Sequence, residues 1–388
     1  MRVYTVLTGG VRNSAQMRMA QKNTEVEIEG RRLTLTNLEK VMYPVVGFTK
    51  GQLIEYFVRI APVLLPHLHN RPLTLKRYPE GVNGFYFYEK NCPAHRPDWV
   101  QTARIWSGGN NRWMQYCMCQ DLPTLVWCGN LADIELHTSL SLAKEIMRPT
   151  VLAFDLDPGA PANIIQCCQV GLWVRDVFEE LGMEAFPKTS GSKGLQVYVP
   201  LNTPTSYDET KPFARAIARL FEHYHPELVV SDMKKSLRTG KIFVDWSQND
   251  DHKTTISVYS LRAKDRPTVS TPVKWEEVAA TLKNKDSELL VFESHQVLAR
   301  AEKWGDLFEP VLTRKQKLPP IEELEHAVAK VMGAAQAAQV EVKGRQGVEV
   351  AVPKPSSKTK PSHAKPKVAA KTTSKAVPRR TKRQVKHG

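Results

Sequence analysis

Two aspartates close a short apolar run in the middle of the chain. Residues 151–157 read Val-Leu-Ala-Phe-Asp-Leu-Asp, and Pro158-Gly159 follows. Such a run predicts a buried strand entering a turn. Because side chains alternate along a strand, Asp155 and Asp157 should face the same way. Adjacent carboxylates repel each other, and a divalent cation such as Mg²⁺ or Mn²⁺ relieves that repulsion. The alternative is that both acids cap the turn or pair with arginines.

Three further features are typical of a site for a metal-bound triphosphate. A third acid, Asp245, ends a second strand-like run, and three carboxylates on neighbouring strands suit two metal ions. Residues 190–194, Ser-Gly-Ser-Lys-Gly, offer N–H groups, a hydroxyl and an ammonium to a phosphate, although their order is not that of a P-loop. Arg262 suits bidentate phosphate contact. Taken singly, these features also fit a cap, a plain hairpin and a surface ion pair.

The surrounding periodicity predicts the elements that position these residues. Capping boxes at Thr49 and Ser206 begin helices with apolar faces, and Cys167 to Leu181 keeps helical spacing. Residues 184–190 and 195–201 should form a hairpin around the glycine turn. Further helices are expected at 36–43, 275–283, 293–304 and 318–338, and a helix or buried segment at 122–130. A strand or hairpin around Gly30 is expected at 25–35, strands at 71–78, 132–136, 241–246 and 255–261, and a loop at 108–111.

Composition indicates a globular protein without a membrane segment. The chain has 388 residues, 41% of them hydrophobic, which is enough for one large domain or two medium ones. The absence of an apolar leader or membrane run predicts a cytoplasmic protein. Six cysteines without a Cys-x-x-Cys pair disfavour a zinc site, and we expect buried free thiols.

Most of the net charge of +15 lies in a C-terminal tail. Residues 343–388 hold 14 Lys or Arg and one acid, Glu349, whereas the rest of the chain is nearly neutral. A segment rich in Lys and Pro cannot bury a core. We therefore predict a disordered segment at 1–24, a catalytic domain at 25–312, a helical extension at 313–342 and a disordered basic tail at 343–388.

Seven motifs occur in an order that resembles the polymerase domain of bacterial ligase D, a branch of the archaeo-eukaryotic primase superfamily. The resemblance covers about residues 33–310. The motifs read LTNLEKVMYP at 35–44, RPLTLKRYP at 71–79, IELH at 134–137, FDLDPG at 154–159, SGSKG at 190–194, FVDWSQN at 243–249 and YSLR at 259–262.

The resemblance implies a fold and a set of site residues. The fold would be of the α/β (α+β) class, a two-lobed primase-polymerase with an RRM-like catalytic sheet. Two Mn²⁺ or Mg²⁺ ions would be held by the three aspartates. The nucleotide would be bound by His137, Ser190, Lys193, Gln196, Arg262 and, more weakly, Thr254. A 5′-phosphate across a gap would be bound by Asn37, Lys40 and Lys50, and template bases would stack on Phe87 and Tyr88.

Some of these assignments have alternatives. Phe87 and Tyr88 could be core residues, and the tail could be a solvated linker. Gln196 stands where the family usually has histidine, so its contact to the triphosphate is in question, and it could instead bond within its own hairpin. The sequence does not contain the Lys-x-[Asp/Asn]-Gly motif of ligases.

The resemblance implies a function and partners. We expect a stand-alone template-dependent nucleotidyltransferase that fills gaps and extends 3′ ends in non-homologous end joining, with a preference for ribonucleotides. Its partners would be DNA ends and gapped duplexes with a 5′-phosphate, NTP or dNTP, a separate ligase and a Ku-like protein, at the nucleoid rather than a membrane. The alternatives are a primase that starts chains de novo and a non-catalytic protein that binds DNA ends.

Overall fold

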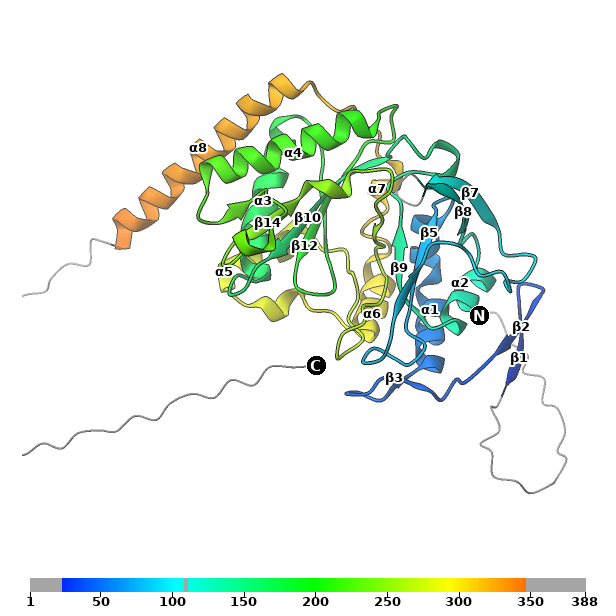
Figure 1. The fold of residues 1–388 in the computed structure, drawn as a ribbon. Helices are drawn as coiled ribbons and strands as arrows, with labels where there is room; N and C mark the ends of the chain where they lie inside the picture. The colour runs from blue at the N-terminus through cyan, green and yellow to red at the C-terminus, as the bar shows by residue number, and fades with distance from the viewer. Residues whose placement is uncertain (1–22, 108–110, 347–388) are drawn as a thin grey trace, which may run out of the picture. The chain divides into compact units, whose positions relative to one another are not determined.

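The computed structural model describes residues 23–107 and 111–346, with side chains as far as residue 334. The chain divides into Met1–Gln339 and Val340–Gly388. Within the first unit, the described residues build two separate main sheets, each with helices packed against it (Figure 1). Each sheet has its own large cluster of buried apolar side chains, so the unit has two lobes.

The first sheet carries the Asp-Leu-Asp motif on its central strand. Its order is β11-β12-β10-β14-β13. The strands span Phe186–Thr189, Leu195–Pro200, Val151–Pro158, Ile242–Asp245 and Val229–Val230, respectively. Strand β10 runs antiparallel to both β12 and β14. Its apolar side chains Leu152, Phe154 and Leu156 face a buried core, so the alternating aspartates must lie on the opposite face.

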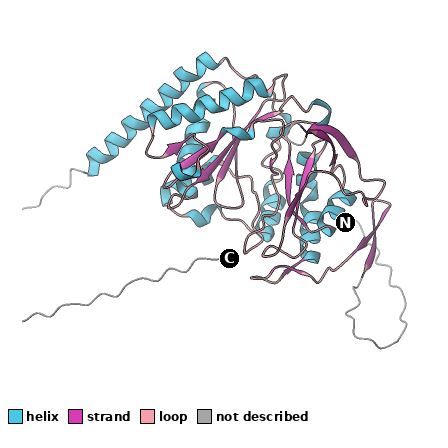
Figure 2. Ribbon diagram, in the orientation of Figure 1, coloured by secondary structure: helices cyan, strands magenta, loops and turns pink. Residues whose placement is uncertain are grey.

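Two long helices cover the apolar face of this sheet, as the strands and helices of Figure 2 show. Helix α3 (Ile164–Glu180) begins at Asn163, and α4 (Tyr207–Tyr224) begins at Ser206, each with a capping box. Phe154 of β10 contacts Phe178 of α3 at a ring-centroid distance of 5.8 Å. Because the helices cover the apolar face, the aspartates of β10 lie on the face turned away from them.

The second sheet lies in the other lobe, with the order β15-β9-β5-β8-β7 and β6 paired to β5. The strands span Thr255–Ile256, Asp133–Thr138, Leu73–Arg77, Arg112–Cys117, Thr102–Ser107 and Phe87–Glu89, respectively. Helices α1 (Lys50–Leu68) and α2 (Leu122–Asn130) pack on each other and on this sheet. Thr49 forms the predicted capping box at the start of α1.

The remaining elements lie before α1 or after the last strand of the chain. The hairpin β1 (Thr24–Ile28) and β2 (Arg31–Leu35) and the pair β3 (Val41–Tyr43) and β4 (Phe48–Thr49) precede α1. Helices α5 (Trp275–Asn284), α6 (Ser294–Trp304), α7 (Pro310–Thr313) and α8 (Ile321–Gln346) follow the last strand. Leu324, Val328 and Met332 of α8 are buried in the core of the first lobe. Among the described helices, none has the length and hydropathy needed to span a bilayer.

Three local predictions were wrong. The residues predicted as a helix from Thr36 form a turn and then β3, because Asn37 takes a left-handed backbone conformation with φ of 54°. The strand predicted at 255–261 ends at Ile256, since the backbone turns at Tyr259, where φ is 63°. Thr24, the last residue of the segment predicted to be disordered, begins β1 instead.

The C-terminal boundary and the cysteines also differ from expectation. Helix α8 continues to Gln346, four residues beyond the predicted extension. Cys92 and Cys117 form a disulfide with a Cα–Cα distance of 4.9 Å, whereas the other four cysteines are buried free thiols as predicted. These two cysteines are 25 residues apart in the sequence, and cysteine spacing alone does not reveal which residues pair. The predictions for residues 1–22, 108–110 and 347–388 lie outside the described residues.

Candidate active site

Four polar side chains form a row across the first sheet. Asp155 lies directly opposite Asp245 on one side and Gln196 on the other, and Gln196 lies opposite Lys188. Directly paired residues of antiparallel strands share a face, with Cβ atoms about 4.5–5.5 Å apart. The row therefore brings together two of the three predicted metal ligands, and Asp157 lies two residues further along the same face.

The carboxylates of this face repel one another. Burial, followed by the negative charges of Asp157 and Asp245, raises the pKa of Asp155 to about 7. Burial also raises the pKa of Asp157, although the nearby ammonium of Lys193 opposes this. Clustered carboxylates with too little positive charge around them fit a divalent cation, which prefers oxygen ligands. The residues present therefore suit the metal ions that the sequence predicts.

Asp245 is held by the turn that follows its strand. Its Oδ1 accepts hydrogen bonds from the backbone N–H and the hydroxyl of Ser247, at 3.0 and 2.6 Å. Its Oδ2 accepts one from the amide of Gln248, at 2.7 Å. Further along this turn, Asp250, Asp251 and His252 bring ligand atoms within 4.8 Å of one another. Because Lys211 forms an ion pair with Asp250, this second cluster is already partly neutralised.

The raised pKa of Asp155 predicts a pH-dependent stability. An acid with a higher pKa in the folded state binds protons more tightly there, so its contribution to stability is lost as pH rises from about 4 to about 7. Without metal, Asp155→Asn should therefore raise the melting temperature at pH 8, by about 2–4 °C per kcal/mol recovered, and change it little at pH 4. Thermal denaturation at both pH values in a chelator tests this. An equal or lower melting temperature at pH 8 would show that repulsion at Asp155 is negligible.

The glycine turn is closed by its own serine. Ser190 Oγ accepts hydrogen bonds from the backbone N–H groups of Ser192 and Gly194, at 3.2 and 3.1 Å. Gly191 has φ of 66°, and a Cβ atom there would lie 2.5 Å from the carbonyl carbon of Val269, so only glycine fits. The backbone N–H groups predicted to bind phosphate are thus partly occupied within the turn.

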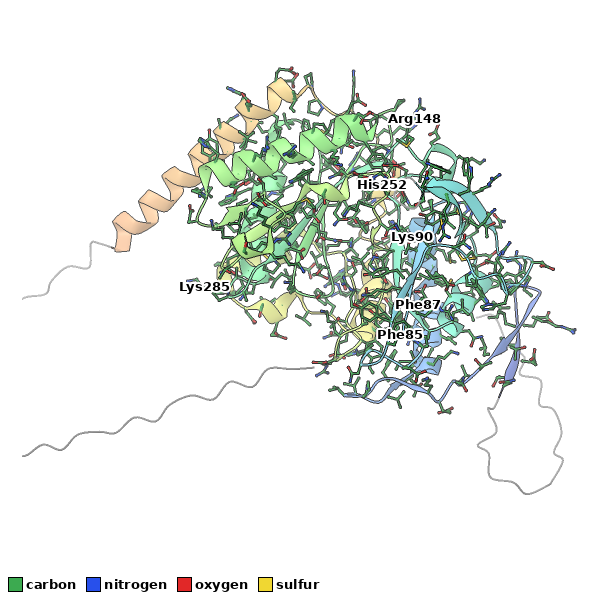
Figure 3. The ribbon with its side chains drawn as sticks, in the orientation of Figure 1. Phe85, Phe87, Lys90, Arg148, His252 and Lys285 are labelled. Carbon is green, nitrogen blue, oxygen red and sulfur yellow. A yellow bond between two sulfur atoms is a disulfide. The ribbon has the colours of Figure 1, made fainter. Side chains whose placement is uncertain are left out.

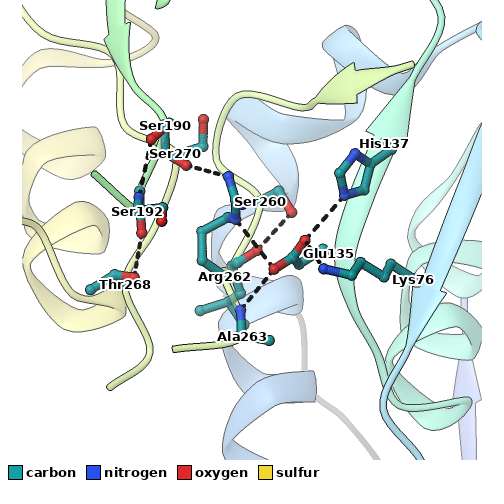
Figure 4. A network of polar contacts seen from close by, with 12 residues as sticks. Lys76, Glu135, His137, Ser190, Ser192, Ser260, Arg262, Ala263, Thr268 and Ser270 are labelled. Carbon is teal, nitrogen blue, oxygen red and sulfur yellow. Dashed lines mark hydrogen bonds and ion pairs between the residues drawn. The ribbon is translucent and has the colours of Figure 1, made fainter. Parts of the chain in front are cut away.

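Arg262 joins this turn to the second sheet (Figure 4). Its Nη1 donates to the carbonyl oxygen of Ser190 at 2.6 Å, and its Nε lies 3.3 Å from Glu135 Oε1. Lys193, also in the turn, extends its ammonium to the carbonyl oxygen of Pro158 at 3.1 Å, beside the aspartates. Predicted nucleotide ligands from separate segments of the chain therefore come together next to Glu135 and the aspartates.

Glu135 of β9 is the centre of a buried charge cluster that the sequence analysis missed. It lies 3.1 Å from Lys76 Nζ and 3.2 Å from His137 Nε2. Burial alone would raise the pKa of Glu135, but the hydrogen bond from His137 and the charge of Arg262 hold it well below its usual range. The same strand period that makes Asp155 and Asp157 neighbours places Glu135 beside His137, so the signal was present in the sequence.

The side chains of His137 and Tyr88 come together beside this cluster. Burial lowers the pKa of His137, although Glu135 opposes the shift. The ring centroids of Tyr88 and His137 are 5.8 Å apart. Lys76 lies between three tyrosines, with its Nζ 4.8–5.3 Å from the ring centroids of Tyr78, Tyr86 and Tyr88. The ammonium of Lys76 and the three tyrosine rings thus lie together, a combination that suits a nucleobase.

The predicted template residues lie at the surface rather than in a core. Tyr88 is 55% exposed, and Phe87 is half-buried. Phe87 stacks on Phe85, as the side chains labelled in Figure 3 indicate, with ring centroids 5.8 Å apart. Exposed neighbouring aromatic rings are unfavourable unless something covers them, so core packing does not account for these residues.

A separate basic pocket of about 610 Å³ gathers the residues predicted to bind a 5′-phosphate. Asn37, Lys40 and Lys50 line it together with Arg77. The buried ammonium of Lys50 donates to the carbonyl oxygen of Thr36 at 2.7 Å. Burial, followed by the charges of Lys40 and Arg77, lowers the pKa of Lys50 to about 8. Glu80 lies 3.2 Å from Lys40 and Glu89 lies 2.7 Å from Arg77. Three cations beside two acids leave a net positive charge, which suits an anion.

Gln196 and Thr254 are the remaining predicted nucleotide ligands. Gln196 is only 4% exposed, and its Oε1 accepts a hydrogen bond from Lys188 Nζ at 2.5 Å. This contact lies within its own hairpin, which is the alternative that the sequence left open. Thr254 is half-buried and immediately precedes β15.

The family model of the LigD primase-polymerase domain matches residues 49–308 of this chain. The multifunctional non-homologous end joining protein LigD of Mycolicibacterium smegmatis is 39% identical over 282 residues, which are 72% of this chain and 36% of that protein. The bifunctional LigD of Bacillus subtilis is 32% identical over 252 residues, or 65% of this chain and 40% of that protein. The chain thus spans well under half the length of these relatives.

A solved structure matches the same part of the chain. It is the polymerase domain from Mycobacterium tuberculosis ligase D in complex with DNA, with a TM-score of 0.67 and 37% sequence identity. The match covers 74% of this chain and 99% of that one. The likeness therefore extends over one whole domain.

Proposed function

This chain belongs to the LigD primase-polymerase domain family, a family of nucleotidyltransferases with the archaeo-eukaryotic primase fold, and on this premise we propose that it is a template-dependent polymerase of non-homologous end joining. It adds nucleotides to primer 3′ ends and fills gaps during double-strand break repair. The observation that carries the proposal is the row in which Asp155 and Asp245 face each other, with Asp157 on the same face.

The three aspartates would hold two divalent metal ions, Mn²⁺ or Mg²⁺. When bound, such ions activate the primer 3′-hydroxyl and neutralise the charge of the triphosphate and the leaving pyrophosphate. Asp245 is already oriented by Ser247 and Gln248. The protein therefore contributes carboxylates whose positions are set before the substrates arrive.

The residues around Glu135 would bind the nucleotide. Arg262 is held in place by Ser190 and Glu135, which leaves other N–H groups of its guanidinium to contact phosphate oxygens. Lys193 adds a charge beside the aspartates. The lowered pKa keeps His137 neutral near pH 7. If the Nε2–H of His137 donates to Glu135, Nδ1 of the same ring becomes an acceptor. This acceptor suits a hydroxyl group of the nucleotide. Thr254 remains a weaker candidate.

The DNA would lie across the second lobe. The pocket of Asn37, Lys40 and Lys50 would receive the 5′-phosphate on the far side of a gap, and Phe87 and Tyr88 would stack on template bases. The solved relative is in complex with DNA, which supports DNA binding by this chain. A separate ligase and a Ku-like protein would complete the repair, at the nucleoid in the cytoplasm.

Primer extension tests the proposal against its alternatives. With a labelled primer on a gapped template and Mn²⁺, we expect extension by NTP and dNTP that a chelator stops. Synthesis of dinucleotides on an unprimed template would instead favour a primase. Binding of DNA ends without metal-dependent incorporation would favour a non-catalytic protein.

The basic tail should strengthen DNA binding without changing the chemistry. Each phosphate contact made by a Lys or Arg steepens the log–log salt dependence of binding to B-DNA by about 0.9, and residues 343–388 hold 14 such residues. Deletion of this segment should weaken binding at low salt and flatten the slope, with turnover at saturating DNA nearly unchanged. Fluorescence anisotropy at several salt concentrations measures this. An unchanged slope would instead indicate a solvated linker or a partner-binding tail.

A further inference from the structure

The ammonium of Lys188 is buried at one end of the row of polar residues. Lys188 is 1% exposed, and its Nζ contacts Gln196 Oε1 at 2.5 Å, Ser270 Oγ at 2.7 Å and the carbonyl oxygen of Ile256 at 3.1 Å. The hydroxyl of Ser270 donates to the carbonyl oxygen of Thr189, so its oxygen is left to accept from Lys188. Three acceptors thus match the three N–H bonds of an ammonium.

This arrangement fixes the orientation of the Gln196 side-chain amide. An ammonium only donates hydrogen bonds, so Gln196 must turn its oxygen towards Lys188 and its NH₂ group the other way. The residue directly opposite Gln196 on that other side is Asp155. The Gln196 side chain forms a hydrogen bond with the Asp155 side chain. Gln196 therefore donates to a carboxylate assigned above to metal binding.

We propose that Lys188 and Gln196 are positioning residues, with Lys188 holding the amide of Gln196 so that it orients the Asp155 carboxylate for metal binding. This rests on the proposed function of Asp155 as a metal ligand. With 4% of its side chain exposed and its amide engaged at both ends, Gln196 does not contact the triphosphate. Its effect on nucleotide addition is exerted through Asp155.

Direct measurement of Mn²⁺ binding to the nucleotide-free protein tests this. Isothermal titration calorimetry at pH 7.5 compares the wild type with Gln196→Met and Lys188→Met, which keep similar volumes. Loss of an outer hydrogen bond to a metal ligand typically weakens metal binding about 10–100-fold, and we expect this for both variants. Burial lowers the pKa of Lys188 to about 7, although the charge of Asp155 opposes the shift. Loss of its remaining positive charge would strengthen Mn²⁺ binding, so the weakening expected for Lys188→Met has the opposite sign. Lys193→Met, in the same hairpin but outside the row, is the matched control for removal of a cation.

The double variant Lys188→Met/Gln196→Met tests whether the two residues act in series. If Lys188 acts through Gln196, the double variant should bind Mn²⁺ as weakly as Gln196→Met alone, and the two effects should not add. Additive losses would overturn the coupling. If Lys188→Met does not fold, Gln196→Met still decides whether the amide acts on Asp155.

A second titration with nucleotide separates the possible failures. Unchanged Mn²⁺ affinity in Gln196→Met, together with weaker nucleotide binding, would overturn the proposal and assign Gln196 to the triphosphate. If Asp155→Asn binds Mn²⁺ as tightly as the wild type, the metal role of Asp155 itself is wrong, and the proposed function fails with it. Weaker Mn²⁺ binding in both Asp155→Asn and Gln196→Met supports both.

Discussion

Alanine in place of Asp155, Asp157 or Asp245 is expected to reduce nucleotide incorporation by at least about 10³-fold. Metal ions contribute several kcal/mol of transition-state stabilisation, and each 1.36 kcal/mol is a factor of ten in rate. Asp155 and Asp245 face each other directly across two strands, so the loss of either should disrupt the same metal site. Single-turnover primer extension measures the rates.

The same variants should still bind DNA. The basic pocket and the exposed aromatic residues lie on the second lobe, whereas the aspartates lie on the sheet of the first lobe. Asp251→Ala is the matched control, because Asp251 belongs to the acidic cluster on the turn that follows β14. We expect it to retain activity. Incorporation at the wild-type rate by any of the three aspartate variants would remove that residue from the mechanism.

The second large effect concerns the 5′-phosphate. The wild-type protein should extend a primer faster across a gap with a 5′-phosphate than across one with a 5′-hydroxyl, because a terminal phosphate carries more charge than an internal diester. A hydrogen bond to a charged group contributes about 1.5–3 kcal/mol, which corresponds to roughly 10–150-fold. Lys40→Ala and Lys50→Met should each lose much of this preference. Lys283→Ala, an exposed lysine of α5, should keep it.

The preference should also depend on pH. Lys50 has a pKa lowered to about 8 by burial and by the charges of Lys40 and Arg77, so its positive charge is present below that pH and is lost above it. We expect the discrimination between the two gaps to fall as pH rises through about 8, although the bound phosphate will shift the transition upwards. Equal use of both gaps by the wild type at pH 7 would refute the assignment of this pocket.

The sequence predicted the elements whose signal is local. The apolar faces and capping boxes of α1 and α4 required no information beyond neighbouring residues, and both boxes are present. The alternation in β10 likewise placed Asp155 and Asp157 on one face. The turn around Asn37 was missed because the sequence pattern there is weakly helical. The left-handed backbone of Asn37 and the hydrogen bond from buried Lys50 to Thr36 favour the turn instead.

The candidate site depends on long-range pairing that one sequence does not reveal. The motif order grouped Asp155 with Asp245, but their register, and that of Gln196 with Lys188, exists only in the sheet. Glu135 was missed because its partners Lys76 and Arg262 come from distant segments. The disulfide of Cys92 and Cys117 was missed for the same reason.

The most direct test of the central claim is the addition of one nucleotide to a gapped duplex with a 5′-phosphate, repeated with each of the four template bases. The reactions compare NTP with dNTP, in Mn²⁺ and in a chelator. The account predicts that the complementary nucleotide is added in each case, that ribonucleotides are preferred and that the chelator stops the reaction. No addition, or addition that does not depend on the template base, would contradict the claim that this protein is a template-dependent polymerase.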